Sequence, residues 1–478
     1  MKSIGNVPNL FLPLLLAGAA FGMFVLTGAR TIQWQDSAQF TYRIAAGELE
    51  NSYGLAMAHP LHFWLGRLAA GLFPDQVPWA VSGVSALGGA VAVGLVVWIV
   101  QRITREVKAA FFAGVSLMLA HTFWRFSGLP EVYTLSAALL LGQMAVYLTM
   151  DWDEPSLRKW ALLFGLNGLS LANHNMALLA LPTWGVLWLL TCWKHPGFWK
   201  SVPVLALTWL AGSLPYTGWV FIQILHADAW MPVVRSALFG HSFADQVTSL
   251  QFEGFYAFIS IGFLVLSLPI AGLLALWALR VFRTSLWPLL TLLGTHLIFF
   301  LRYNVIDQYT FFIPAMALVA VLGGLGFSRL NAPRVRNAAL VLVMLQPVLY
   351  AVTPSLVRVS GVMDRFARNK PYRDDANYLF RPWQVQERSA HRMAAEAFEL
   401  VGDQGILVVE DSMAMYTLKW MRLHLDTDAV QIMPVDAFSE DLLTQEPSTT
   451  VIRIPKRTDS PVPEGWQRSG FFLIPDKS

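Results

Sequence analysis

The sequence predicts an all-α polytopic membrane bundle followed by a small C-terminal α/β domain. Of its 478 residues, 55% are hydrophobic and 14% are charged, and the mean hydropathy is +0.49. Soluble domains carry about 25% charged residues, so this balance is typical of helices that face lipid. Apolar windows of membrane-spanning length recur through residues 1–356 and then stop. Charged residues and prolines become frequent in residues 357–478, which we expect to form the second domain.

The apolar windows predict about eleven transmembrane helices. The first window is too long for the apolar core of a signal peptide, and no small-x-small cleavage site follows it, so we expect an uncleaved helix. Windows 109–123 and 160–172 are short, which is consistent with tilted or broken helices. The full set is 8–28, 78–100, 109–123, 131–150, 160–172, 177–193, 202–225, 255–279, 285–301, 309–327 and 337–355.

The connections between these windows fall into two sets by charge. One set is longer but poor in basic residues, and it includes the first outer loop, residues 29–77. The other set is rich in basic residues, and the positive-inside rule places it in the cytoplasm. We therefore expect the first outer loop and the C-terminal domain on the extracytoplasmic side. The basic set comprises Lys2, Arg102, Arg105, Lys108, Arg158, Lys159, Lys194, Lys200, Arg280, Arg283, Arg329, Arg334 and Arg336.

Further elements are expected outside the bundle. After Pro60, apolar residues at positions 61, 64, 65, 68 and 72 share one face of a helix, which we expect to lie along the membrane interface. In the C-terminal domain, residues 389–400 predict a helix. Short strands are predicted at 405–410, 430–433, 450–454 and 471–474.

Several classes of site are excluded by what the sequence lacks. Cys192 is the only cysteine, which excludes an intrachain disulfide framework and a Cys-based metal cluster. The absence of GxxxxGK[ST], HExxH and GxSxG argues against an ATP-driven pump and a zinc protease. Gly323, Gly324 and Gly326 end an apolar window and predict helix packing rather than a dinucleotide loop. Because the basic residues follow membrane topology, nucleic acid is not an expected partner.

Polar residues are concentrated in the outer loop that carries Asp36. A carboxylate at membrane depth is costly unless it faces water, protein or substrate. Asp36 could act as a general base by accepting a proton from a bound hydroxyl. It could equally cap a short helix, with Gln39 three residues later completing a capping box.

Other outer-loop residues have similar pairs of interpretations. His59, next to Pro60, could bind an anionic phosphate or a metal, or it could be a structural histidine with its hydrogen bonds satisfied. Arg125 and Glu131 could pair with each other, or they could share a cavity with Asp36.

Two later outer connections add three more candidates. His174 could contribute to a site or simply end a helix. Arg302 could bind a lipid phosphate, because a guanidinium pairs with phosphate oxygens bidentately, or it could pair with Asp307. The position of all these residues on one face is what favours a functional site.

These motifs resemble those of the protein O-mannosyltransferase-like membrane proteins of the GT-C class. In that family the first outer loop reads Asp-Ser-Gly-Glu-Phe and then His-Pro-Pro-Gly-Tyr-Pro. The matching segments here are Asp36-Ser37-Ala38-Gln39-Phe40, His59-Pro60-Leu61-His62-Phe63, Glu131-Val132-Tyr133-Thr134-Leu135, Asn173-His174, and Tyr303-Asn304-Val305 with Asp307. The similarity extends in order over about the first 330 residues.

The resemblance implies an inverting glycosyltransferase that moves a sugar from a polyprenyl phosphate to a protein or glycan hydroxyl on the extracytoplasmic face. Asp36 would be its catalytic base. Membrane lipid would surround the bundle, the lipid-linked sugar would be a substrate rather than a cofactor, and a divalent metal is left open. Gln39 stands where the family has Glu, which leaves an inactive member open. The implied substrate-binding residues are Gln39, His59, Arg125, Glu131, His174, Arg302 and Asp307, with Arg125, Arg302 and His59 at the lipid phosphate.

Two other functions are compatible with the same residues. A transporter or flippase for a lipid-linked substrate would use the same cavity, although such proteins often contain repeated halves and this sequence has no clear repeat. A non-catalytic assembly protein would instead use the C-terminal domain to bind a partner.

Overall fold

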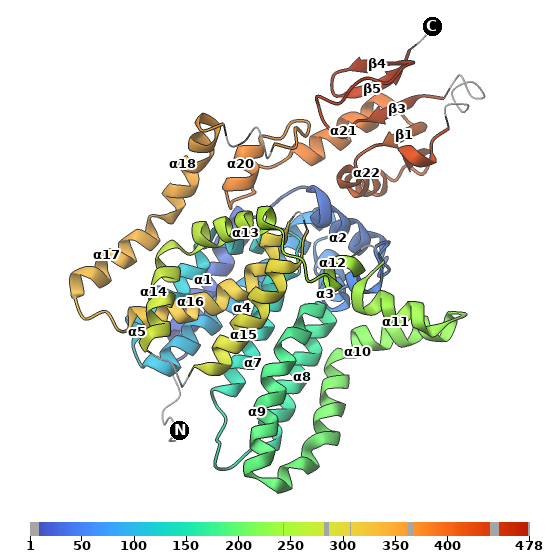
Figure 1. Ribbon diagram of the computed structural model, residues 1–478. Helices are drawn as coiled ribbons and strands as arrows, with labels where there is room; N and C mark the ends of the chain where they lie inside the picture. The colour runs from blue at the N-terminus through green and yellow to red at the C-terminus, as the bar shows by residue number, and fades with distance from the viewer. Residues whose placement is uncertain are drawn as a thin grey trace.

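A computed structural model describes residues 9–241, 243–281, 286–305, 307–361, 363, 367–439 and 449–476. Lys2 and Arg283, two basic residues expected in the cytoplasm, lie outside the described residues. A helical bundle occupies most of the chain, and a small α/β domain follows it (Figure 1). The predicted two-part architecture is therefore confirmed.

Every expected apolar window coincides with a continuous helix or with a broken one. Two windows begin with a 3-10 segment: η3 (Asn175–Ala180) leads into α9 (Leu181–Lys194), and η5 (Gln308–Phe312) leads into α16 (Ile313–Phe327). The continuous helices are α1 (Phe11–Thr27), α4 (Val77–Thr104), α7 (Tyr133–Tyr147), α8 (Leu157–Asn173), α10 (Val202–His226) and α15 (Trp287–Arg302).

Three windows are sharply bent pairs of helices. α5 (Val107–Met118) meets α6 (His121–Ser127) at 65°, α13 (Gly254–Ser267) meets α14 (Pro269–Val281) at 97°, and α17 (Pro333–Met344) meets α18 (Gln346–Val359) at 52°. By length and composition, four of the described helices could cross a membrane, or seven if each bent pair is one span. Helices α1, α7 and α15 are shorter apolar helices. The eleven predicted windows are therefore all helical, but some of these helices are shorter than a full membrane span or are bent.

Glycines allow the closest helix contacts in the bundle. A Cβ at Gly168 would lie 2.1 Å from the Trp209 carbonyl oxygen, and one at Gly212 would lie 2.2 Å from the Gly165 carbonyl oxygen, so α8 and α10 touch through their backbones. A Cβ at Gly326 would lie 2.0 Å from the carbonyl oxygen of Leu274 on α14. Small residues permit this approach in membrane bundles. The packing role predicted for the glycines at the end of α16 is confirmed.

Short helices cover one end of the bundle. The expected helix after Pro60 is present as α3 (Pro60–Leu72), and Trp64, Leu68 and Leu72 on its apolar face are exposed. Its other face buries Phe63 and Ala70. The remaining elements here are α2 (Gln35–Ala46), α3 (Pro60–Leu72), α11 (Trp230–Phe239) and α12 (Ala244–Thr248).

The C-terminal domain contains a five-stranded mixed sheet with the strand order β2-β1-β3-β5-β4. β1 pairs in parallel with β2 and β3, whereas β5 pairs antiparallel with β3 and β4. The four predicted strands and the helix near residue 389 are present, but β4, α20 and α22 had no clear signal in the sequence. The elements are α20 (Asp375–Phe380), α21 (Ser389–Val401), β1 (Gly405–Val409), α22 (Ser412–His424), β2 (Val430–Pro434), β3 (Val451–Ile454), β4 (Trp466–Ser469) and β5 (Phe472–Pro475).

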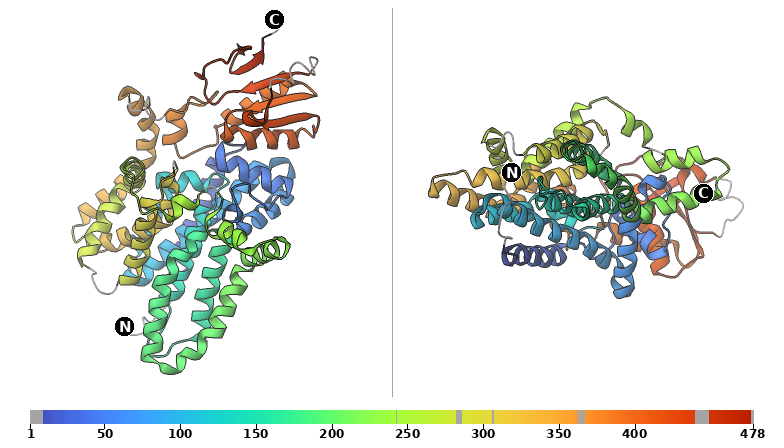
Figure 2. Two further views of the ribbon diagram at one scale, coloured as in Figure 1. Left: turned by 45° about the vertical axis from the view of Figure 1, so that its right-hand side comes forward. Right: turned by 90° about the horizontal axis from the view of Figure 1, so that it is seen from below.

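The C-terminal domain packs directly on the segment that carries Asp36. Trp34 Nε1 donates to Ser389 Oγ at 2.8 Å, and Thr417 Oγ1 donates to the Gln33 carbonyl at 3.0 Å. Residues of α2 share a buried apolar cluster with α21, α22 and the sheet. In two views the domain lies at the end of the bundle opposite the α9–α10 connection (Figures 1 and 2). This places it on the same face as α2.

Candidate active site

Asp36 lies at the start of α2, but it does not cap the helix. The helix begins after Trp34, Gln35 has a φ of 59°, and the N-terminus has no side-chain hydrogen bond to cap it. The capping alternative is therefore not observed. Asp36 is instead exposed to an internal space, where it lines two cavities.

Two cavities meet at a group of acidic side chains. One, which we call the apolar cavity, has a volume of about 560 Å³, and the other, which we call the polar cavity, has a volume of about 400 Å³. Asp36, Glu131 and Asp307 line both of them. They come from α2, the α6–α7 connection and the segment before η5, so only the folded bundle brings them together.

The apolar cavity follows one face of α13. Phe255, Phe258, Ile259 and Phe263 line it, and Phe255 and Phe258 are 57% and 75% exposed. A Cβ at Gly262, also in the lining, would meet nothing within 4 Å. The cavity is therefore wide enough and apolar enough to hold a hydrocarbon chain.

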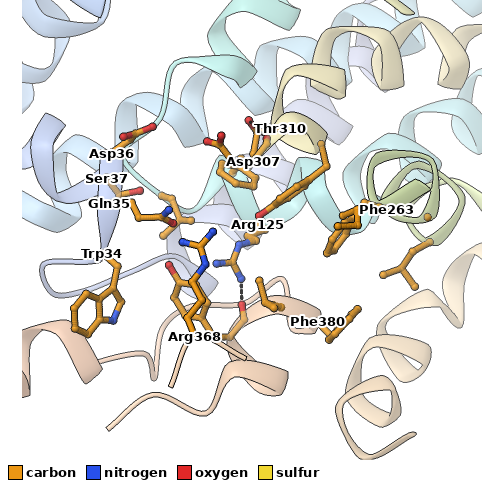
Figure 3. Close-up of a pocket in the computed structure, with 18 of the residues that line it drawn as sticks. Trp34, Gln35, Asp36, Ser37, Arg125, Phe263, Asp307, Thr310, Arg368 and Phe380 are labelled. Atoms are coloured by element: carbon orange, nitrogen blue, oxygen red, sulfur yellow. Dashed lines mark hydrogen bonds between the residues drawn. The ribbon is translucent and has the colours of Figure 1, made fainter. Parts of the chain in front are cut away.

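Three arginines line the inner part of the apolar cavity. Arg125 projects from α6, whereas Arg368 and Arg373 belong to the segment after α18. Figure 3 shows Arg125 and Arg368 below Asp36 and Asp307, with Phe263 and Phe380 further along the cavity. The cavity thus combines an apolar part with an end where the three arginines lie near the acidic group.

The polar cavity is lined by amides, rings and hydroxyls. Gln39 Oε1 accepts a hydrogen bond from Asn51 Nδ2 at 3.1 Å, and both residues are buried. The rings of His59 and His174 stack with centroids 4.9 Å apart, and Tyr133 packs beside His174. All five residues line this cavity.

The pKa values of Asp36, Glu131 and Asp307 are all raised, which favours their protonated forms. Desolvation within the internal space, followed by the charge of Asp307, raises the pKa of Asp36 to about 7. Burial also raises the pKa of Asp307. Burial and the charge of Asp36 raise the pKa of Glu131 well above its usual range, although Ser37 Oγ donates to Glu131 Oε1 at 3.1 Å. A carboxyl with a pKa near neutrality can exchange a proton with substrate.

Two of the expected phosphate ligands lie elsewhere. Arg302 lines neither cavity, because its guanidinium donates to the carbonyls of Val247 (3.1 Å) and Ser249. His59 lines the polar cavity, its Nδ1 lies 2.8 Å from the Asn173 carbonyl oxygen, and burial lowers its pKa to about 4. A neutral imidazole there cannot supply positive charge to a phosphate in the apolar cavity.

The remaining expected residues reach the two cavities. Arg125 lines the apolar cavity, Gln39 and His174 line the polar one, and Glu131 and Asp307 line both. His174 also accepts a hydrogen bond from the Met176 amide at 3.1 Å. No ion pair joins Arg125 to Glu131, or Arg302 to Asp307, in the part of the chain that the structure describes.

The described residues contain no group of three or more His, Cys, Asp or Glu side chains that could hold a metal ion together.

Sequence reasoning missed Arg368 and Arg373. Their segment, which also contains Lys370, is a short basic run that follows the last apolar window after a short interval. A basic run beside the membrane is a signal that could have identified them. The sequence alone places this run in the second domain, because Arg373 and Arg125 meet only around the ring of Tyr378, far along the chain from α6.

Two solved structures resemble this chain in fold. The crystal structure of ArnT from Cupriavidus metallidurans bound to undecaprenyl phosphate aligns with a TM-score of 0.63 at 14% identity, covering 92% of each chain. The apo structure of the same protein aligns with a TM-score of 0.62 at 15% identity, again over 92% of each chain. At this identity the likeness concerns the fold alone. No protein of curated function has a significantly similar sequence.

Part of the bundle also matches a family model. Residues 46–196 match the protein O-mannosyl-transferase TMEM260 N-terminal domain. The matched range contains His59, Arg125, Glu131 and His174, and Asp36 lies before it. This part of the chain is therefore similar to the TMEM260 N-terminal domain, and the chain as a whole shares the fold of ArnT.

Proposed function

We propose that the protein transfers a sugar from a polyprenyl phosphate to an acceptor hydroxyl at the extracytoplasmic face, with Asp36 as the general base. The observation that carries the proposal is the position of Asp36, at the junction of an arginine-lined apolar cavity and a polar cavity. A transferase needs two substrates to meet at one reactive group, and this arrangement provides that meeting point.

The donor would occupy the apolar cavity. Its isoprenoid chain would lie along the aromatic face of α13, and its phosphate would lie near Arg125, the one of the three expected phosphate ligands that lines this cavity. The ArnT structure named above contains undecaprenyl phosphate, which supports a lipid phosphate as the ligand class. The acceptor would enter through the polar cavity, where Gln39, Asn51 and His174 offer hydrogen bonds to hydroxyl groups.

The reaction would be a single displacement. The acceptor oxygen forms a bond to the anomeric carbon while the bond from that carbon to the phosphate oxygen breaks, so the configuration inverts. The acceptor proton passes to the Asp36 carboxylate, and the electron pair leaves with the polyprenyl phosphate. Arg125 stabilises the charge on that phosphate, because a fixed cation away from bulk water acts on a developing anion strongly.

Transfer by the purified full chain tests the proposal. Polyprenyl-phosphate sugars, including the mannosyl form that the family match suggests, are supplied with protein and glycan acceptors. We expect a covalent product from the wild type and from Asp245→Asn, an exposed outer carboxylate that lines neither cavity, but not from Asp36→Asn. Transfer by Asp36→Asn at the rate of the wild type would rule out Asp36 as the general base. Lipid movement across liposomes without a covalent product would identify a flippase instead.

A further inference from the structure

We propose that Arg368 and Arg373, from the segment that joins the bundle to the C-terminal domain, complete the binding site for the lipid phosphate together with Arg125. The inference rests on the proposed function and extends it. It makes the C-terminal domain part of the donor site, whereas its position in the sequence suggests a separate appendage.

Arg125 and Arg373 are organised around a single aromatic ring. Their guanidinium carbons lie 4.4 Å and 4.4 Å from the centroid of Tyr378. Arg125 is also fixed by donation to the Tyr378 carbonyl. Such stacking holds a guanidinium plane in place without using up its N–H groups.

Both of these guanidiniums retain an N–H group without a protein acceptor. Arg125 is 3% exposed, and its Nε has no hydrogen-bond partner. The Arg373 side chain is 2% exposed, and its Nη1 likewise has none. Both residues line the apolar cavity, where an anionic ligand would supply acceptors for their side chains.

Asp375 positions the segment that carries the other two arginines. Its Oδ2 accepts from the backbone amides of Arg368 (2.6 Å) and Asn369 (3.0 Å), while its Oδ1 accepts from Arg373 Nε at 2.6 Å. One carboxylate therefore fixes the chain direction at Arg368 and the side chain of Arg373. Asp375 acts through these residues and is a positioning residue.

The charge and surroundings of the site favour a phosphate attached to a lipid. Arg373 has Asp375 as its counter-ion, but Arg125 and Arg368 are in no ion pair within the described ranges. The aromatic face of α13 lines the same cavity and leads away from the arginines. A ligand that is anionic at one end and apolar along its length fits both features.

The test measures binding of a long-chain polyprenyl phosphate to the full chain in lipid nanodiscs. Charge-assisted hydrogen bonds are each worth about 1.5–3 kcal/mol, so Arg368→Gln and Arg373→Gln should each weaken binding roughly tenfold or more. Arg392→Gln is the matched control, because Arg392 is an exposed arginine of the same domain that stacks on Tyr372 outside the cavity. Thermal unfolding of each variant shows whether it is folded.

Several outcomes would overturn the inference. Wild-type affinity in folded Arg368→Gln and Arg373→Gln proteins would do so, as would an equal loss in Arg392→Gln. The uncharged polyprenol should bind weakly, and equal binding of the alcohol would show that no phosphate is recognised. Inorganic phosphate binding as tightly as the lipid would show that the source is free phosphate.

A double-mutant cycle separates positioning from direct contact. If Asp375 acts through Arg373, adding Asp375→Asn to Arg373→Gln should weaken binding by less than the sum of the two single effects. Full additivity would contradict that role. Arginine-dependent lipid binding in a protein that transfers no sugar would sustain this site while the proposed function fails. Sugar transfer that depends on Asp36, together with lipid binding that does not depend on these arginines, would support the proposed function and rule out this site.

Discussion

Asp36 and Asp307 lie together at the junction of the apolar and polar cavities, and the charge of Asp307 adds to the effect of burial in raising the pKa of Asp36 to about 7. Asp36 is on α2, whereas Asp307 lies just before η5, much later in the sequence. Their proximity links the proposed base to a second carboxyl whose charge tunes it.

The first prediction concerns the pH dependence of transfer. A general base must be ionised to accept a proton, so activity should rise as the pH increases through about 7 and fall below it. The dependence of kcat/KM on pH between about 5 and 9 checks this. A profile that is flat across this interval would contradict Asp36 as the base.

Replacing Asp307 should shift this profile. Because the negative charge of Asp307 raises the pKa of Asp36, Asp307→Asn should move the acid limb to lower pH. Asp245→Asn changes an exposed outer carboxylate that lines neither cavity and should leave the limb in place. An acid limb that moves to higher pH in Asp307→Asn would show that the coupling between the two carboxyls has the opposite sign.

Asp36→Asn should lose transfer yet gain stability above neutral pH. A folded-state pKa raised above the ordinary value of 3.8 means that the folded protein holds this proton more tightly than the unfolded chain. Stability is therefore lost as the pH rises from that value to about 7, and an amide removes this penalty. Thermal unfolding of both proteins at pH 5 and pH 8 checks the sign, because the difference should be larger at the higher pH. A larger stabilisation at pH 5 would contradict it.

Filling the apolar cavity should impair donor use without unfolding the bundle. Gly262 lines the cavity and faces open space, so Gly262→Trp would occupy the volume assigned to the lipid chain. We expect a raised KM for the donor and an unchanged KM for the acceptor. Gly272→Trp is the control, because Gly272 on α14 also faces open space but does not line the cavity. An equal KM for the donor in the two variants would show that the lipid chain of the donor does not bind in this cavity.

The contact between α8 and α10 should be intolerant of a single methyl group. Gly168→Ala places a Cβ 2.1 Å from the Trp209 carbonyl oxygen, so the helices must separate, and overpacking of this kind costs about 1–3 kcal/mol. Gly71→Ala on α3 meets nothing within 4 Å and should cause no loss of stability, because alanine favours a helix more than glycine does. Thermal unfolding in detergent measures both effects, and an unchanged melting temperature for Gly168→Ala would show that the two helices can move apart freely.

The candidate site was only partly predictable from sequence. Asp36 and Arg125 could be selected because polar residues in outer loops of an apolar chain are few and costly. Arg302 was expected at the phosphate by the same reasoning, but its side chain turns to the carbonyls of Val247 and Ser249. The direction in which a side chain points depends on neighbours that are distant in the sequence. The spacing of residues along the chain carries no information about these neighbours.

The sequence by itself determined the apolar segments, their order, the two-domain division and the acidic residue most in need of a function. These depend on composition and local periodicity. Tertiary structure alone decided that Asp36, Glu131 and Asp307 meet, that helices break within three windows, and that Arg368 and Arg373 reach the apolar cavity. The reason is physical: cavities and charge clusters arise where distant segments pack, and their free energies depend on burial and distance rather than on position along the chain.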